Sequence, residues 1–192
     1  DTIINAINLH NNMDLKMLVK SGKNLVINMF DYAVNLNTHL EIELEDRSNL
    51  TINCTFIAEV KYELDIDTKL YGDNIETKVN IRGINEPEGI VRITMNGTVA
   101  GNTKGNVIEE YAHILNKSRL SNIIIPNLII NTNEVEANHG VTIGQISEDE
   151  LFYMMSKGIN RSTATKIIEE GFIKEGLDLD VKEKIQNILV GR

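Results

Sequence analysis

The sequence is poor in residues that cross-link or stiffen small domains. Its only cysteine is Cys54, which excludes an intramolecular disulfide framework and a cysteine-rich zinc or iron–sulfur site within one chain. There are two prolines and no tryptophan, and aromatic residues make up 5% of the chain, which argues against a surface that stacks sugars. Cys54 itself lies in an alternating apolar pattern, which predicts a small buried side chain.

Clustered positive charge and long apolar runs are also missing. The chain has 19 Lys and Arg against 28 Asp and Glu, for a net charge of -9. Nucleic acids and anionic membranes are bound by clustered Lys and Arg, so we expect neither as a partner. No apolar run approaches the ~20 residues of a membrane span, and the first residues lack the pattern of a signal peptide. The scarcity of cysteine fits a cytoplasmic protein.

The motifs of common enzyme classes are absent from the sequence. It contains no P-loop, no dinucleotide fingerprint, no GxSxG and no HExxH spacing among its four histidines. Glu109 and Glu110 are neighbours in a predicted strand, so their side chains would point to opposite faces and could not act on one substrate. The sequence therefore gives no indication of these enzyme classes.

Apolar and polar residues alternate with a period of two from about Leu25 to Ile143. This pattern predicts about nine short strands, separated by turns of Asn, Asp, Gly and Ser. We assign residues 1–146 to a β core, within which residues 1–24 show no clear period. In that first stretch Asp14 predicts the cap of a short helix that reaches Val19. The clearest strands are 40–45, 50–56, 60–66, 75–82, 90–99, 107–115, 128–131 and 135–143.

The spacing of the strands, with no helices between them, is compatible with a sandwich, a barrel or a parallel β-helix. Asparagine recurs at strand ends, and a β-helix stacks like residues on like residues, so asparagines in successive turns could form amide ladders. No repeat of fixed length is visible. Composition and period alone leave the sandwich and the β-helix equally favoured.

From residue 147 the period becomes helical, and we assign residues 147–192 to a C-terminal helical region. Ser147 and Glu150 form the pattern of a capping box, and the helix that follows is expected to stop at Gly158. A second helix, capped at Asn160 or Ser162, is expected to end before Gly171. A third is expected from about 180 to 189, with one apolar side formed by Val181, Ile185, Ile188 and Leu189.

Two features could carry function. His139 follows Glu134 and Glu136 near the last strand, where it could satisfy the backbone at a sheet edge, bind a metal or switch an interface. The apolar run Leu151 to Met155 could pack on the core, or dock into a groove of a partner, or do both with different faces.

Residues 138–159, NHGVTIGQISEDELFYMMSKGI, carry a resemblance to a known family. They resemble the C-terminal core of the SufB/SufD family, the scaffold components of the Suf iron–sulfur cluster assembly system, which reads close to SHGAT-G-ID-E-LFYL-SRGI there. Residues 164–172 are similar to the next helix of the family, and a looser similarity begins at residue 89. The chain is thus identified as a member of this family, and it is expected to begin within or just before the family's core.

The resemblance implies a mostly β fold, a right-handed parallel β-helix with short C-terminal α-helices. It implies a non-catalytic scaffold that forms a homodimer or a SufB/SufD-type heterodimer and binds SufC, the ABC-type ATPase of the system. No cofactor would be bound stably, although an iron–sulfur cluster could be held transiently. The alternative is a β-helix protein of the carbohydrate-binding or lyase type, and a third possibility is a self-polymerising β-solenoid.

The family's sites map onto this sequence residue by residue. The possible cluster ligands are His139 and Glu136. The residues expected to bind SufC are Leu151, Phe152, Tyr153, Met155, Lys157, Gly158 and Ile159, and those expected at the dimer interface are Tyr111, His113, Asn138 and His139. SufB carries a cysteine at about Tyr111, and it has EHE where this chain has NHG. The missing cysteine argues against a SufB-type thiolate site, and the NHG sequence makes the chain resemble SufD or an archaeal single-subunit type.

Overall fold

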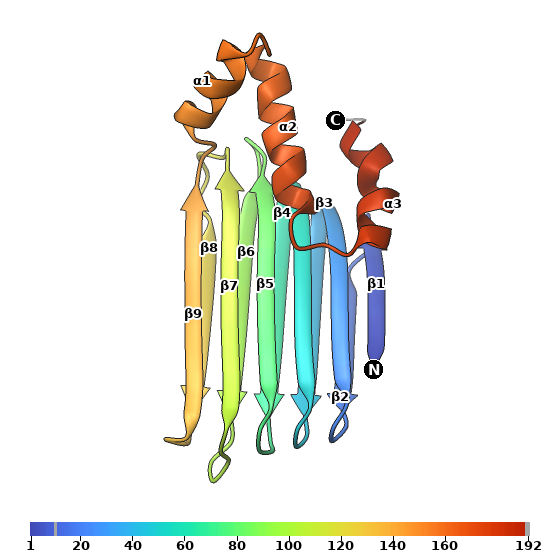
Figure 1. Ribbon diagram of the computed structural model, residues 1–192, viewed down its shortest axis with the longest axis vertical. Coiled ribbons are helices and arrows are strands. Elements are labelled where there is room, and N and C mark those ends of the chain that lie inside the picture. Colours follow the sequence, from blue (N-terminus) through green and yellow to red (C-terminus); the bar gives the residue numbers. More distant parts are fainter. Residues whose placement is uncertain (10, 191–192) are drawn as a thin grey trace.

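The computed structural model describes residues 1–9 and 11–190, which form a parallel β-solenoid of about five turns with three helices at one end of its strands (Figure 1). Every strand pairs with its neighbours in parallel, and partners lie one turn apart in the sequence. The expected β-helix is therefore confirmed. Its strands are β1 (Thr2–Asn8), β2 (Met13–Val19), β3 (Asn24–Leu44), β4 (Asn49–Leu70), β5 (Glu76–Asn85), β6 (Ile90–Val99), β7 (Asn106–Asn116), β8 (Ile123–Ile130) and β9 (Val135–Gly144).

The turns are flattened, so each contributes a strand to two facing sheets. One sheet has the order β1–β3–β4–β5–β7–β9, and the other contains β2, the second halves of β3 and β4, β6 and β8. The long strands β3 and β4 continue from one sheet into the other, past a shift of register between Ala33 and Asn35. Alternate side chains point inward and fill the space between the sheets with Leu, Ile, Val, Met and Phe. Cys54 is completely buried among them, as predicted.

Asparagine ladders run along the first sheet. Asn5, Asn28, Asn53 and Asn80 occupy equivalent positions in four successive turns. Each side-chain amide of the last three donates to the amide oxygen one turn earlier, over 2.9–3.1 Å. The amide ladders expected for a β-helix are thus present, and they satisfy polar groups that adjacent turns would otherwise leave unpaired.

The corners opposite the helices are stacked as regularly as the strands. Gly22, Arg47, Asn74 and Gly105 lie in successive turns, and each has a positive φ between 54° and 69°. The N–H of each donates to a carbonyl of the next turn over 2.8–3.0 Å. This left-handed backbone favours glycine and asparagine, which explains why such residues separate the strands in the sequence.

The first 24 residues differ from the prediction. Residues 13–19 form strand β2 and residues 2–8 form β1, so the expected short helix at Asp14 is wrong. Both strands pair in register with β3. Their alternate residues Ile4, Ala6, Met13, Leu15 and Met17 pack against the core, and this tertiary pairing outweighs the local capping signal.

The helices are α1 (Glu148–Ser156), α2 (Arg161–Lys174) and α3 (Leu179–Val190). Asn160 caps α2 by accepting from the Thr163 N–H, and Gly158 has the positive φ expected after α1. The capping box is wrong, because the Ser147 hydroxyl makes no cap hydrogen bond; three acidic residues in the first turn of α1 favour the helix dipole instead. Helix α2 also continues past Gly171, because Ile173 beyond it is buried against the solenoid.

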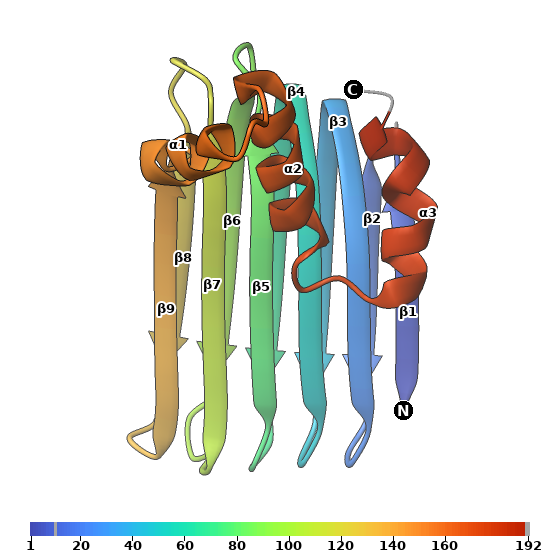
Figure 2. The same cartoon turned by 45° about the horizontal axis from the view of Figure 1, so that its top comes forward.

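The helices cover part of the first sheet near the carboxyl ends of its strands (Figure 2). A second core forms there between outward-facing Phe30, Ile57, Ile84 and Leu115 and the apolar side of the helices. As predicted, Val181 and Ile185 of α3 are fully buried, and Ile188 and Leu189 pack beside them. No helix in the described part of the chain is long and apolar enough to cross a membrane.

Candidate functional site: the open end of the solenoid and the α1–α2 hairpin

The last turn of the solenoid is uncovered. Strand β8 pairs only with β6 and β9 only with β7 among residues 1–9 and 11–190, so each leaves one backbone edge without a neighbouring strand. Apolar side chains are exposed on both strands: Ile123, Ile125, Ile129, Val141 and Ile143. Unpaired edges flanked by exposed apolar residues are suited to pairing with another chain.

His139 lies in this last turn. It belongs to the inward-facing row of β9, in which Val135 and Ala137 pack against the core, yet its own side chain is exposed because no further turn covers it. Its partner in the register with β7 is Glu110. The two residues therefore stand one above the other on the inner side of the first sheet.

The sequence interpretation considered Glu110 only beside Glu109 and did not connect it with His139. It is 1% exposed, and its Oε2 has no hydrogen-bond partner among the described residues. Its carboxylate points across the interior towards Gly97 of β6, where a Cβ would lie 2.9 Å from Oε1. Burial raises the pKa of this carboxyl to about 7. The signal was available, because Glu110 interrupts the apolar inward row between Ile108 and Ala112.

The structure separates several residues that the resemblance grouped. Glu136 is three residues from His139 on the same strand, so the two side chains leave β9 on opposite faces and do not form a ligand pair. Asn138 also lies on the outer face. Tyr111 lies outside too, with its ring 3.2 Å from the position of a Cβ on Gly140.

His113 lies under a helix rather than at the open end. Its ring makes an edge contact with Phe172 of α2, with 5.0 Å between ring centroids, and the Arg82 guanidinium lies over the same phenyl ring. Burial, and the positive charge of Arg82, lower the pKa of His113. His113 thus helps to anchor α2 on the solenoid.

Helix α1 has one buried side and one exposed side. Leu151 is 3% exposed and packs inward, whereas Phe152 is 74% and Tyr153 65% exposed. Met155, Lys157 and Gly158 are exposed as well, and Ile159 is half-buried. Beside Tyr153, a shallow hollow of about 430 Å³ is lined by Asp149, Glu150, Met154 and Ile168. Exposed rings on a short helix form a suitable surface for a partner protein.

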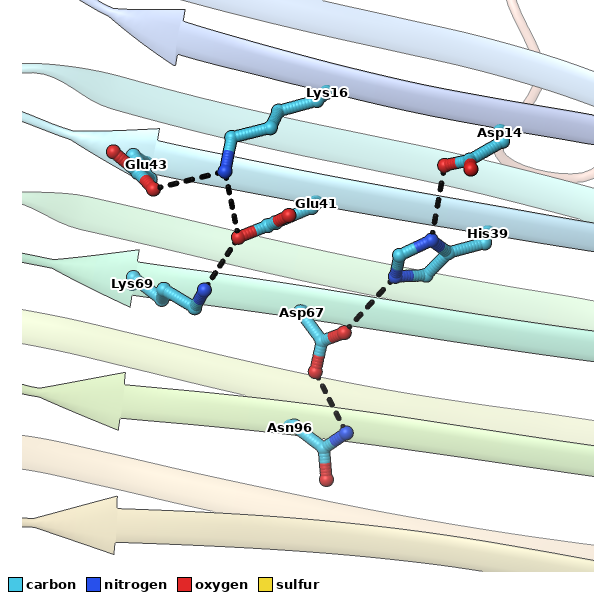
Figure 3. A network of polar contacts seen from close by, with 8 residues as sticks. All are labelled: Asp14, Lys16, His39, Glu41, Glu43, Asp67, Lys69 and Asn96. Carbon is cyan, nitrogen blue, oxygen red and sulfur yellow. Dashed lines mark hydrogen bonds and ion pairs between the residues drawn. The ribbon is translucent and has the colours of Figure 1, made fainter.

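The outer face of the second sheet carries a chain of polar contacts that the sequence interpretation did not identify (Figure 3). The two ring nitrogens of His39 lie 3.1 Å from carboxylate oxygens of Asp14 and Asp67, and Asp67 also accepts from Asn96 over 2.7 Å. Beside them Glu41 binds both Lys16 and Lys69. The hydrogen bond to Asp67 is the main cause of a raised pKa of His39.

Replacement of His39 by glutamine tests this contact. A raised folded-state pKa stabilises the protein fully below the unfolded value of about 6.5, and the effect is lost as the pH rises through the folded value. We expect His39→Gln to reduce the free energy of unfolding by at most ~1 kcal/mol near pH 5.5, because the pair is partly exposed, and by less at pH 8.5. Urea titrations at the two pH values measure the difference; an equal loss at both would contradict a protonated His39.

No group of three or more His, Cys, Asp and Glu side chains in the described part of the chain is arranged to hold a metal ion. Comparison with known families decides the wider assignment. Residues 23–172 match the domain described as "SUF system FeS cluster assembly, SufBD core domain", which is most of the chain. The chain belongs to the SufBD core family. The solenoid from β3 onward, α1 and all but the last two residues of α2 lie within the matched SufBD core region.

Three relatives illustrate the range of this family. The chain is 34% identical over 100 residues to the "Iron-sulfur cluster assembly SufBD family protein PH1385" of Pyrococcus horikoshii, covering 48% of this chain and 22% of that protein. It is 38% identical over 50 residues to SufD of Escherichia coli, and the match covers 26% of this chain and 12% of that protein. It is 38% identical over 61 residues to SufB of Bacillus subtilis, and the match covers 32% of this chain and 13% of that protein.

The matched segments thus cover less than a quarter of these relatives' own lengths. Membership of an iron–sulfur assembly family sets aside the carbohydrate-binding and lyase alternative. Both SufB and SufD occur among the relatives, so the matches agree with a SufBD core but do not choose between the two types.

Proposed function

We propose that the chain is a non-catalytic scaffold subunit of a Suf-type complex, which pairs through the open end of its solenoid and binds the SufC-type ABC ATPase through α1. The observation that carries the proposal is the SufBD core match, which includes both the uncovered strands β8 and β9 and the exposed rings of α1. The two surfaces lie next to each other, because α1 follows β9 after three residues.

The pairing surface fits either a second copy or a SufB/SufD-type partner. Two parallel edges and a partly open apolar interior would be covered by the same end of another solenoid, as in a closed dimer. Light scattering on the chain alone and with its co-expressed relative distinguishes these partners. A chain that stays monomeric in both cases would contradict the proposal.

The ATPase surface is tested by co-purification of the chain with the ABC-type ATPase from the same source. Retention in one complex through size-exclusion chromatography is expected. Complete separation of the two proteins at micromolar concentration would show that α1 does not bind the ATPase. It would not bear on the pairing proposal, which is tested separately.

We further propose that an iron–sulfur cluster is transient cargo at the open end, held by His139 and Glu110. Imidazole nitrogen and carboxylate oxygen both bind iron. Glu110 is paired with His139 in the register, and its Oε2 has no hydrogen-bond partner among the described residues. Glu110 replaces Glu136 in this role, because Glu136 lies on the other face of β9. The remaining ligands would come from across the interface.

Anaerobic reconstitution with iron and sulfide tests this site. We expect His139→Ala and Glu110→Gln each to reduce the iron bound per chain and the visible absorbance to near background. His39→Gln, a histidine change on the opposite sheet, is the matched control and should bind iron as the wild type does. Equal iron in all four proteins would remove His139 and Glu110 from the site.

A further inference from the structure

Helix α2 rests on the solenoid by two different kinds of contact. Its C-terminal half is held by apolar packing, in which Ile173 is fully buried against Ile84 and Leu115. Residues of its N-terminal half line two hollows. A hollow of about 1140 Å³ lies between this half, α3 and the solenoid corner, and a smaller one of about 210 Å³ lies between α1, α2 and the end of β7.

An ion pair stands between the two hollows. Lys117, directly after β7, places its Nζ 2.9 Å from Oε1 of Glu169 on α2 and 2.7 Å from Oε2 of Glu86 at the solenoid corner. Its backbone is fixed, because the Lys117 N–H donates to the Asn85 carbonyl over 2.8 Å. The Glu169 side chain is only 9% exposed, so it depends on this lysine for compensation of its charge.

Helices α1 and α2 pack against each other. Leu151 and Ala164 are buried, and Arg161 at the start of α2 binds the Glu148 carboxylate at the start of α1, over 3.0 Å for one of the two contacts. Besides the link after β9, the described contacts of the hairpin with the solenoid are the Lys117 ion pair, the burial of Ile173, and the contacts of Phe172 with His113 and Arg82 near the end of α2. Glu175, which follows α2, also pairs with Arg82 over 3.0 Å.

We propose that the Lys117–Glu169 pair is a latch that holds the α1–α2 hairpin against the solenoid, and that the hairpin swings about the Ile173 contact when the latch opens. Opening exchanges a partly buried ion pair for hydrated charges. The latch joins the α1–α2 hairpin, which carries Phe152, to the residue directly after β7, so a movement of the hairpin is transmitted to the last turns of the solenoid. Only the identity of the protein that moves the hairpin rests on the proposed function.

Distances between two spin labels test the latch on the chain alone. Lys157→Cys reports on the end of α1 and Glu76→Cys on the start of β5, while buried Cys54 stays unlabelled in the folded protein. Pulsed electron resonance should give one narrow distance distribution with Lys117 in place. Lys117→Met and Glu169→Gln should each add a second, separate population, and Lys117→Arg should restore the single one.

Lys78→Met, which removes an exposed ion pair with Glu109 between β5 and β7, is the matched control and should leave one population. A single unchanged distribution in both Lys117→Met and Glu169→Gln would overturn the latch. So would the same broadening in the Lys78→Met control, since that would indicate general loosening. None of these outcomes depends on ATPase binding, so failure of the latch and failure of the docking proposal are distinguishable.

Discussion

Replacement of Phe152 by aspartate is expected to weaken binding of the ABC-type ATPase about 100-fold, which corresponds to roughly 3 kcal/mol. The side chain is 74% exposed at the centre of the apolar run of α1, with Tyr153 and Met155 on either side. A buried aromatic anchor commonly dominates an interface, and a carboxylate in its place would be buried without a partner. Titration of the ATPase by calorimetry measures the loss.

The same substitution should not affect folding, because Phe152 buries little surface in the free chain. Leu179→Asp is the matched control, since Leu179 is 69% exposed on α3, away from the hairpin surface. It should bind the ATPase as the wild type does. Equal affinity of the Phe152→Asp variant and the wild type would show that α1 is not the docking helix.

The second large effect is expected from Asp31, a carboxylate inside the solenoid. It is fully buried and accepts hydrogen bonds from the Tyr62 hydroxyl over 2.6 Å and from Thr38 over 3.2 Å, while its Oδ1 has no partner among the described residues. Burial is the main cause that raises the pKa of this carboxyl to about 6. Ionised Asp31 therefore destabilises the folded state at neutral pH.

Asp31→Asn is expected to raise the free energy of unfolding at pH 7.5 by about 3 kcal/mol, since two pKa units are equivalent to about that energy. The folded state holds the proton more tightly than the unfolded chain. The stabilisation of the wild-type folded state by this proton is therefore complete below about pH 4 and is lost as the pH rises through about 6. At pH 4 the two proteins should be about equally stable, because asparagine resembles the protonated acid.

Urea unfolding at pH 4 and pH 7.5 gives the comparison. Asp65→Asn, on the outer face of the same solenoid, is the control and should change stability by less than ~0.5 kcal/mol. A variant that is less stable than the wild type at pH 7.5 would show that the Asp31 charge is compensated in the folded protein.

The sequence predicted the strands well where alternation is strong, but it could not choose between a sandwich and a solenoid. Alternation reports which side of a strand is buried, whereas the fold depends on which strand lies next to it. The asparagine rows were the one local clue to stacking, and they do form ladders. Residues 1–24 were misread because their strands are defined by pairing with β3, which local patterns do not reveal.

The spatial arrangement of the candidate residues was predicted in part for the same reason. Residues close in the chain, such as Phe152 and Tyr153, lie together on one exposed helix surface. Glu136 and His139 are equally close in sequence but leave a strand on opposite faces. Glu110 and His139 are 29 positions apart and adjacent in space, because the register of β7 and β9 brings them together. Lys117 and Glu169 are still further apart in the sequence, so their pairing could be found only in the structure.

The packing of α3 on β1 has a consequence for synthesis. Within the solenoid each strand pairs with residues about one turn away, so successive turns can fold as they leave the ribosome. Helix α3 instead reaches back across the chain: it packs on β1 and β3, and Asn5 donates to Asp180, which is 175 residues later. Strand β1 therefore acquires its outer cover only after α3 has been translated, so the earliest turn is completed last.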